Sequence, residues 1–599
     1  MLDYLIKNAT VVDGTGAAGY NASVGVQGNK IAAIITEGEL PEAKEVIDAK
    51  GQILAPGFID IHSHADCTLL HDATGDNMIV QGVTTYVGGN CGYSMAPLHK
   101  QDPMFQYVID CRSKYWADKE TPITWKTFAE WLDFARRIPA GVNYAPLVGH
   151  HALRGSVMGM DYERPASEEE REQINILLEE ALDAGVFGMS IMVDPGVAGH
   201  FADRAELETL FKTLEARGSF VTSHTRHHQG QWPSDDGRHF YGVYVGEKGD
   251  VACGRYHGLL EFMELFKTAP KLTACYSHLT SAFVVPMAHS QALEDALLDE
   301  TLRVFVDEPA EEGYPVYFNI LPHEHSVGVI QKVADNLSRS MVFEPRYEAF
   351  ANAAGLLERL GDPAFRKEYK EFIKGGRVKI GMLSPAVDAY WSDCFTFVEA
   401  KDESVLGKTL LEVTKERAPG NYDELIYHNC YDVIFDMILD DPDLAWALTR
   451  DKREYQGVKK LASHPRCMPM ADSGSFSLDT DKWAGNGCNT GTYPLAFTAM
   501  VRYLVDVSRD GGCIGMEEAI RKITSLPADL IKLHDRGRIA EGLQADLVLL
   551  DWEKLGYTID FKRPTLPPDG IRYVWVNGVP AMADGRLTRA LTGQVITRS

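Results

Sequence analysis

The chain has 599 residues, of which 45% are hydrophobic and 24% charged, and its formal net charge is -26. This length exceeds what one simple core supports, so we expect a large domain with at least one smaller unit. The acidic balance argues against nucleic acid or an anionic membrane as the main partner. No apolar run approaches the ~18 residues of a membrane span. The N-terminal sequence lacks a signal-peptide pattern, and the cysteines are dispersed, which together predict a cytoplasmic, reduced protein.

The two ends of the chain share one sequence pattern. Residues 1–54 hold short strand-like runs separated by turns, and residues 537–599 repeat that pattern, with an Asn-Gly turn in YVWVNGVP. Neither end is long enough to bury a good core alone, since ~50 residues is marginal. We therefore expect one small β-sandwich built from residues 1–55 and 537–599, with the rest of the chain inserted between them.

The central part, residues 56–536, alternates strand-like and helix-like segments. GVTTYVGGNCG, NYAPLVGHH, GVFGMSIMV, GSFVTSHTR and KLTACYSHLT are strand-like. Between them ASEEEREQINILLEEALDAG predicts a helix, with Ser167 and Glu170 as a capping box and Gly185 as its C-terminal stop. Repeated strand–helix units over this length predict an α/β fold, a (β/α)8 barrel. The stretch from about 316 to 460 is too long for one unit and predicts a helical insertion.

Two histidines close the strand-like run GFIDIHSHADC. His62 and His64 are two residues apart, so on a strand their side chains share a face, which is the geometry of a metal chelate. A single histidine at a strand end is more often a surface or hydrogen-bonded residue. Asp60 and Asp66 lie beside the pair and strengthen the metal interpretation.

Further ligand types occur where later strands are expected to end. Cys91 lies in GGNCG, and His224 and His278 lie in VTSHTR and YSHLT. Asp472 follows in MPMADSG. Active sites of parallel barrels lie at the carboxyl ends of the strands, where side chains from distant segments meet. A mixed set of imidazole, thiolate and carboxylate groups suits zinc.

With these motifs the chain resembles the amidohydrolase superfamily, and within it the N-acyl-D-amino-acid deacylase (D-aminoacylase) family. The resemblance runs nearly end to end, through GFIDIHSHAD, QGVTTYVGGNCG, GMSIMVDPG, SHTR, SHL, ADSG, GTYP and the tail GRIAEGLQADLVLLD. Many superfamily members bridge two metals with a carboxylated lysine on the fourth strand. Here no lysine occurs between Lys126 and Lys212, and the D-aminoacylase family uses a cysteine at the position of Cys91. A buried inert thiol is the alternative for Cys91.

The resemblance implies one or two zinc ions per subunit and a small N-acyl or amide substrate. It implies a tight metal site of Cys91, His224 and His278, and a weaker second site that is formed by His62, His64 and Asp472. Asp472 would also accept a proton from the attacking water and return it to the leaving nitrogen. The expected activity is hydrolysis of the amide bond of an N-acyl-D-amino acid or a related compound.

Substrate recognition departs from the family pattern. The tyrosine usual before the Pro-Gly after the fourth strand is replaced by Val193 and Asp194, and Leu495 follows GTYP in place of an arginine. Arg226 keeps its position and could pair with a substrate carboxylate, and Tyr314 in EGYPVYF partly keeps another motif. The segment 229–258 is expected at the pocket mouth.

Two alternative functions stay open from the sequence. A cyclic-amide hydrolase of the hydantoinase or dihydroorotase type shares the expected fold, although the missing lysine counts against it. A non-enzymatic scaffold relative is the other alternative, although such relatives typically lose the ligands. The substrate's acyl group and stereochemistry, and whether the chain forms a homo-oligomer, are not encoded in any motif.

Overall fold

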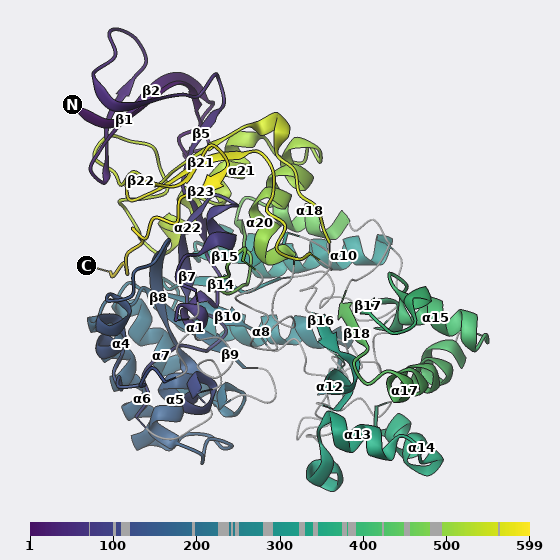
Figure 1. Cartoon of the computed structure of the whole chain (residues 1–599). Coiled ribbons are helices and arrows are strands. Elements are labelled where there is room, and N and C mark those ends of the chain that lie inside the picture. The colour runs from purple at the N-terminus through teal and green to yellow at the C-terminus, as the bar shows by residue number, and fades with distance from the viewer. Residues whose placement is uncertain are drawn as a thin grey trace.

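The computed structural model describes most of the chain. The residues described are 1–70, 72–99, 104–109, 120–193, 198–225, 239–240, 243–245, 251–279, 291–322, 330–338, 345–373, 380, 391–421, 424–448, 456–479, 494–560 and 563–598. Figure 1 shows strands and helices of the middle of the chain below a sheet made by the two chain ends, with a group of helices set to one side.

Eight parallel strands form a nearly closed barrel, which confirms the predicted fold. Their order is β19-β15-β14-β10-β9-β8-β7-β6. The backbone N–H of Asp472 donates to the carbonyl of His62 at 3.1 Å, next to the ends of the two outer strands of this order. The strands are β6 (Phe58–Asp60), β7 (Val83–Gly88), β8 (Asn143–Gly149), β9 (Gly188–Met192), β10 (Phe220–His224), β14 (Thr273–Tyr276), β15 (Val316–Ile320) and β19 (Cys467–Pro469).

Helices cover the outside of the barrel, so its strands are buried on both faces and read as continuous apolar runs. The helix predicted after β8 is α6 (Glu168–Asp183), and its capping box between Ser167 and Glu170 is present. Other covering helices are α4 (Phe128–Ala135), α5 (His150–Met158), α7 (Arg204–Ala216), α8 (Gly254–Phe266), α10 (Gln291–Leu302), α18 (Gln456–Ser463), α20 (Leu495–Tyr503), α21 (Met516–Lys522) and α22 (Ser525–Leu530).

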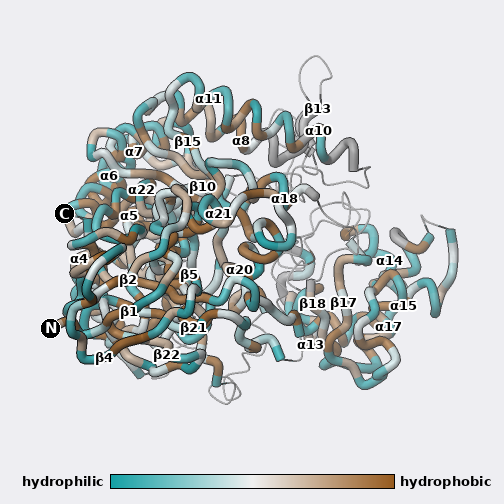
Figure 2. Tube along the Cα trace, turned by 90° about the horizontal axis from the view of Figure 1, so that it is seen from above, coloured by the Kyte–Doolittle hydropathy of each residue, from teal (hydrophilic) through white to brown (hydrophobic). Residues whose placement is uncertain are grey.

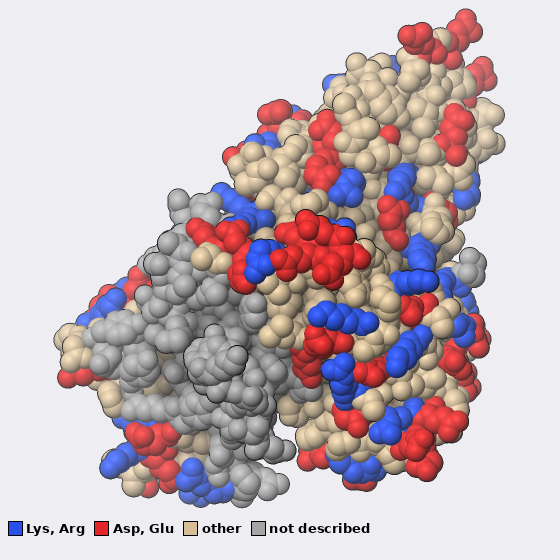
Figure 3. Space-filling view, turned by 180° about the vertical axis from the view of Figure 1, so that it is seen from behind, with Lys and Arg blue, Asp and Glu red and all other residues tan. Residues whose placement is uncertain are grey.

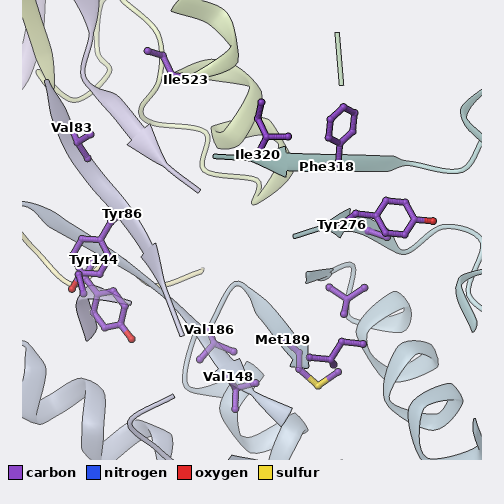
Figure 4. Packing of buried hydrophobic residues seen from close by; sticks show 14 of the residues in the cluster. Val83, Tyr86, Tyr144, Val148, Val186, Met189, Tyr276, Phe318, Ile320 and Ile523 are labelled. Atoms are coloured by element: carbon purple, nitrogen blue, oxygen red, sulfur yellow. The ribbon is translucent and has the colours of Figure 1, made fainter. Parts of the chain in front are cut away.

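Two apolar layers hold the barrel together. The outer layer lies between strands and helices, and Figure 4 shows Tyr86 and Tyr144 side by side within it, with ring centroids 5.1 Å apart. The inner layer fills the barrel, with side chains such as Ile59, Phe220 and Met468. Alternate strand residues supply the two layers, because successive side chains of a strand point to opposite faces. Figure 2 shows the resulting mixture of hydrophobic and hydrophilic residues along each element.

Both ends of the chain share one nine-stranded sheet. β5 (Ile53–Pro56) pairs antiparallel with β20 (Leu547–Leu550), which joins the N-terminal strands to the C-terminal ones. The predicted Asn-Gly turn is present, with Asn577 at φ 51°. The other strands are β1 (Leu2–Val11), β2 (Tyr20–Gln27), β3 (Lys30–Ile35), β4 (Ala43–Asp48), β21 (Ile571–Val576), β22 (Val579–Ala583) and β23 (Arg586–Leu587). The domain boundaries at 55 and 537 stay predictions.

The expected insertion has its own apolar core, around Trp391, Tyr431 and Trp446. It also contains a three-stranded sheet of β16 (Ile330–Lys332), β18 (Ala445–Leu448) and β17 (Phe395–Glu399). Its helices are α12 (Val333–Ser338), α13 (Ala353–Arg359), α14 (Pro363–Phe372), α15 (Leu410–Arg417) and α17 (Cys430–Asp440). The insertion was expected from about residue 316, but Val316–Ile320 form barrel strand β15.

The surface carries both signs of charge. Figure 3 shows acidic and basic side chains next to each other on the back of the molecule, with one dense acidic group near the middle. Among the described residues, no helix combines the length and the apolar character that crossing a membrane requires.

Candidate metal centre

His62 and His64 lie just beyond the end of β6, next to the strand end where they were expected. The backbone N–H of His62 donates to Asp60 Oδ1 at 3.3 Å, and the same carboxylate oxygen accepts from the N–H of Ala471 at 3.2 Å. His62 is completely buried, and the two rings meet edge to face with centroids 5.7 Å apart. Asp60 therefore holds the histidine pair against the segment that follows β19.

Cys91 lies in a tight loop after β7. Its backbone adopts φ 52°, which is uncommon for a residue with a side chain and typical of functional loops. Asn90 Nδ2 fixes the loop by donating to the carbonyl of Val87 at 2.9 Å. Gly92, at φ 75°, is required because a Cβ there would lie 2.8 Å from Nε2 of His151. The loop thereby directs the Cys91 thiol toward the barrel axis.

His224 and His278 complete the group around Cys91. His224 is the last residue of β10, and His278 follows the neighbouring strand β14, so the two side chains meet at the same edge. Nδ1 of His224 and Nε2 of His278 are 2.9 Å apart. Sγ of Cys91 lies 3.6 Å and 3.5 Å from these two nitrogens. Three potential ligand atoms thus face one small volume.

Asp472 approaches the cluster from the loop after β19. Its Oδ1 lies 3.2 Å from Nε2 of His64 and 3.5 Å from Nε2 of His62. The loop is held by Asn77: its backbone N–H donates to the carbonyl of Phe476 at 3.0 Å, and its Oδ1 accepts the backbone N–H of Phe476 at 2.8 Å. Residues far apart in sequence therefore place the carboxylate opposite the thiol.

The environment of the cluster favours the ionised forms of its thiol and its carboxyl group, which are the forms that bind a cation. Burial alone would raise the pKa of the Cys91 thiol, but the charge of His62 and hydrogen bonds from the other histidines hold it well below its usual value. Burial likewise opposes ionisation of Asp472, yet His62 and His64 keep its pKa below the ordinary range. Burial lowers the pKa of His278 to about 4, so its imidazole is neutral near pH 7.

These donors fit a divalent metal ion. One group of mutually close ligand atoms is Cys91, His224 and His278, and two others are His62, His64, Cys91 and His62, His278, Asp472. Thiolate, neutral imidazole and carboxylate are the ligands that zinc accepts. The three groups overlap, because each shares one residue with each of the others: Cys91, His62 or His278. The expected second trio of His62, His64 and Asp472 is not among the three groups.

The other predicted site residues are placed differently. Arg226 lies outside the described residues, as does Asp194. Tyr314 precedes β15, packs against Phe266 at 5.5 Å between ring centroids, and lies at the amino end of the barrel strands. The structure therefore does not bring Tyr314 to the cluster, and a role in substrate binding is not supported. Of the segment 229–258, part forms strands β11 (His239–Phe240), β12 (Val243–Val245) and β13 (Val251–Cys253).

Asn319 is a residue of this site that the sequence analysis missed. It lies in β15 beneath the cluster, and its Oδ1 accepts the backbone N–H of His278 at 2.6 Å. A single amide within an apolar strand gives no signal in sequence, since no motif surrounds it. Only the pairing of β14 with β15 reveals that it faces the ligands.

A parallel barrel with these side chains at its carboxyl end defines the chain as a metal-dependent hydrolase barrel. The model of the amidohydrolase family matches residues 45–307 and 437–582, which is more than half of the chain. The protein therefore belongs to the amidohydrolase family.

Within this family, the chain is similar to several proteins of known activity. The chain is similar to a D-aminoacylase from Alcaligenes xylosoxydans xylosoxydans, with 28% identity over 600 residues that cover 100% of this chain and 98% of the relative. A D-aminoacylase crystal structure aligns over 100% of both chains with 25% identity and a TM-score of 0.67. An N-acyl-D-glutamate deacylase from Bordetella bronchiseptica, solved with zinc and a phosphonate inhibitor, has 23% identity and a TM-score of 0.64, covering 100% of this chain and 99% of that chain. This last similarity supports the fold alone, and the zinc is a component of that structure.

Proposed function

We propose that the protein is a zinc-dependent amidohydrolase that removes the acyl group from an N-acyl-D-amino acid or a closely related N-acyl compound. The observation that carries the proposal is the convergence of Cys91, His224 and His278, with the Asp472 carboxylate opposite them. Similarity to D-aminoacylase over the whole chain supports the substrate class.

The chain's own residues divide the work. When bound, zinc supplies Lewis acidity, which polarises a carbonyl and makes water acidic near neutral pH. Cys91, His224 and His278 would hold the tight ion, and His62, His64 and Asp472 would hold a second, weaker one. Asp472 is ionised and faces the same volume, so its Oδ1 accepts a proton from the attacking water. The same oxygen then returns the proton to the leaving nitrogen, because an amine leaves poorly until it is protonated.

The substrate-binding residues are proposed from the sequence. Arg226, two residues beyond the end of β10, would pair with the carboxylate of the substrate through its planar guanidinium group. The segment 229–258 would line the mouth of the pocket, since loops that follow barrel strands at the carboxyl end line the active site. A cytoplasmic location and a single small-molecule partner remain part of this proposal.

The cyclic-amide alternative is disfavoured by composition. The fourth strand, β9, and its surroundings between Lys126 and Lys212 contain no lysine that could be carboxylated to bridge two metals. The close approach of six ligand-type side chains disfavours a scaffold without activity, because such a cluster serves metal binding or catalysis.

A substrate panel tests the proposal. N-acyl-D-amino acids, N-acyl-L-amino acids and cyclic imides are offered to the purified enzyme, and its metal content is measured in parallel. We expect hydrolysis of the D-configured N-acyl compounds and one to two equivalents of zinc per chain. Activity confined to cyclic imides would favour the alternative, and full activity of metal-free protein would overturn the proposal.

A further inference from the structure

Two adjacent histidines open helix α5, and the proposed mechanism uses neither. They end the motif NYAPLVGHH, whose first residues form β8. His150 turns toward α7, where its Nε2 lies 2.7 Å from Oε1 of Glu206. His151 turns toward the loop that carries Cys91, and only 2% of its surface is exposed. A buried side chain beside a possible metal ligand can act on a metal centre without binding the ion itself.

His151 contacts the loop of residues 89–94, which we call the Cys91 loop. Its backbone N–H donates to the carbonyl of Gly92 at 3.0 Å. Its ring lies so close to Gly92 that a Cβ there would be 2.8 Å from Nε2 and 3.0 Å from both Cδ2 and Cε1. The ring of Tyr93 meets the imidazole edge to face, with centroids 5.1 Å apart. The Cys91 loop therefore packs against this one side chain.

Another part of the same ring is fixed by the segment after β9. Nδ1 of His151 accepts the backbone N–H of Gly199 at 3.2 Å, in the short 3₁₀ helix η1 (Ala198–Phe201). A Cβ on Gly199 would lie 2.9 Å from Cε1 of His151. Gly92 and Gly199 thus hold the imidazole between two backbone segments, because neither has a side chain that would keep it away. The ring cannot move far without displacing one of these segments.

The backbone of Cys91 needs such support. Its φ of 52° is unfavourable for a residue with a side chain, and it persists only where the surroundings impose it. Gly92, the next residue, is fixed by the ring of His151 and by Oγ of Ser190, which accepts the N–H of Gly92 at 2.9 Å. Once this backbone is fixed, a single side-chain torsion decides where the Cys91 sulfur points.

We propose that His151 is a positioning residue whose ring fills the space between the Cys91 loop and η1 and so sets the direction in which the Cys91 sulfur meets a metal ion. The inference rests on the metal centre of the proposed function, but it concerns the binding of the ion and not the reaction. His151 belongs to none of the three groups of ligand atoms found among the described residues, so its ring acts through Cys91.

His151→Ala tests this inference on purified protein without substrate. The variant keeps the backbone N–H that binds Gly92 but removes the ring. We expect the affinity for the first zinc equivalent, measured by chelator competition, to fall about 10–100-fold, the range typical of groups that orient a metal ligand. In protein loaded with Co²⁺, the absorption of the thiolate–cobalt bond should also change, because Cys91 no longer keeps one orientation. An unchanged affinity overturns the inference, and so does an unchanged cobalt spectrum.

His464→Ala is the matched control. His464 is a partly buried histidine that precedes β19, at the amino end of the strands, and its Nε2 lies 2.9 Å from Oδ1 of Asp307. This variant also loses a ring and a hydrogen bond, but it should keep the zinc affinity and the cobalt spectrum of the unmutated protein. An equal loss of affinity in the two variants would point to general loosening of the barrel and would overturn the inference.

His151→Asn covers the case in which the alanine variant does not fold. The shorter side chain keeps an amide oxygen for the N–H of Gly199 but leaves the space beside Gly92 unfilled. We therefore expect the same loss of zinc affinity, and an affinity equal to that of the unmutated protein overturns the inference.

Gly92→Ala probes the same contact from the other side. The added methyl group collides with the ring of His151, whereas in His151→Ala the space is free, and the backbone strain at φ 75° is common to both. The loss of zinc affinity caused by Gly92→Ala should thus be smaller in His151→Ala than in the unmutated protein, and equal losses overturn the inference. Because none of these experiments uses substrate, failure of the proposed hydrolysis would leave their results standing, and the reverse also holds.

Discussion

Two buried clusters of polar side chains lie at the carboxyl end of the barrel, and they handle charge in opposite ways. In the metal centre, nitrogen and sulfur atoms of Cys91, His224 and His278 face one another at 2.9–3.6 Å. In the second cluster, which we call the Glu206 cluster, Glu206 on α7 binds His150 and Arg154 on α5, and all three side chains are completely buried.

The difference lies in which side chains supply the positive charge. Burial alone would raise the pKa of Glu206, but His150 and Arg154 hold it below its usual value of 4.5. That cluster contains its own cation, the Arg154 guanidinium. In the metal centre the positive partners of the thiolate and the carboxylate are the histidine rings themselves, and a bound metal ion could take over that role. Buried histidines beside anionic groups therefore indicate a metal site when no guanidinium pairs with the same anions.

The largest expected effect comes from Cys91→Ala. The proposed tight site has one thiolate and two imidazoles, and it cannot spare the only anionic ligand among them. We expect loss of both zinc and activity, checked by metal analysis and by the rate of substrate hydrolysis. Cys430→Ala is the matched control, because Cys430 is a buried thiol of the insertion, remote from the cluster. A full metal complement in Cys91→Ala would contradict the assignment.

Asp472→Asn is expected to separate catalysis from metal binding. The trio around Cys91 does not include Asp472, so most of the zinc should remain bound. An amide cannot relay a proton from water to the leaving nitrogen, so the turnover should fall by the ~10²–10⁴-fold typical of losing a general acid–base. Turnover rates and metal content are measured on the same preparation. Near-normal turnover would show that another group moves the proton.

Glu206→Gln is expected to lower the free energy of unfolding without removing metal. Arg154 would be left as a buried cation without its carboxylate, which typically costs ~3–5 kcal/mol. Denaturant unfolding measures the loss, and metal analysis of the folded variant should match the unmutated protein. Loss of zinc in this variant would mean that the two clusters are coupled.

Glu206 also makes the free energy of unfolding depend on pH, and the direction of this dependence follows from its pKa. The pKa of Glu206 is lower in the folded chain than its usual value of 4.5, so its stabilising contribution is present above that pH. The contribution is lost as the pH falls below 4.5 toward the folded pKa. Glu206→Gln lacks this contribution, so its unfolding free energy should fall less steeply in this range. An identical pH profile for the two proteins would contradict the assigned shift.

The sequence predicts much of the barrel and of the cluster, for a physical reason. Parallel strands bring their carboxyl ends to one edge, so ligand types that follow successive strands, such as His224 and His278, must lie together. Tyr314 shows the limit of this reasoning. Its motif resembles a family pattern, but two or three residues cannot specify at which end of a strand they lie, and β15 begins after Tyr314.

Pairing between distant strands and the role of a single buried amide cannot be predicted from the sequence, for a different reason. β16 and β18 of the insertion pair although they are separated by more than a hundred residues, and nothing local in either strand encodes that contact. Asn319 likewise gains its meaning only from the neighbours that the barrel gives it, since in the sequence it is one amide in an apolar run.

The smallest expected effect comes from Glu208→Gln, two residues from Glu206 on the same helix. Glu208 forms an ion pair with Arg204 at 2.6 Å, but the Arg204 side chain is 59% exposed, so water competes with the pair and salt screens it. We expect a loss of at most ~0.5 kcal/mol at low salt, the size typical of such helical pairs, and less at high salt. Denaturant unfolding at two salt concentrations measures both values. If the loss equalled that of Glu206→Gln, then burial would not be what distinguishes the two carboxylates, and the contrast between a self-neutralised buried cluster and an exposed pair would fail.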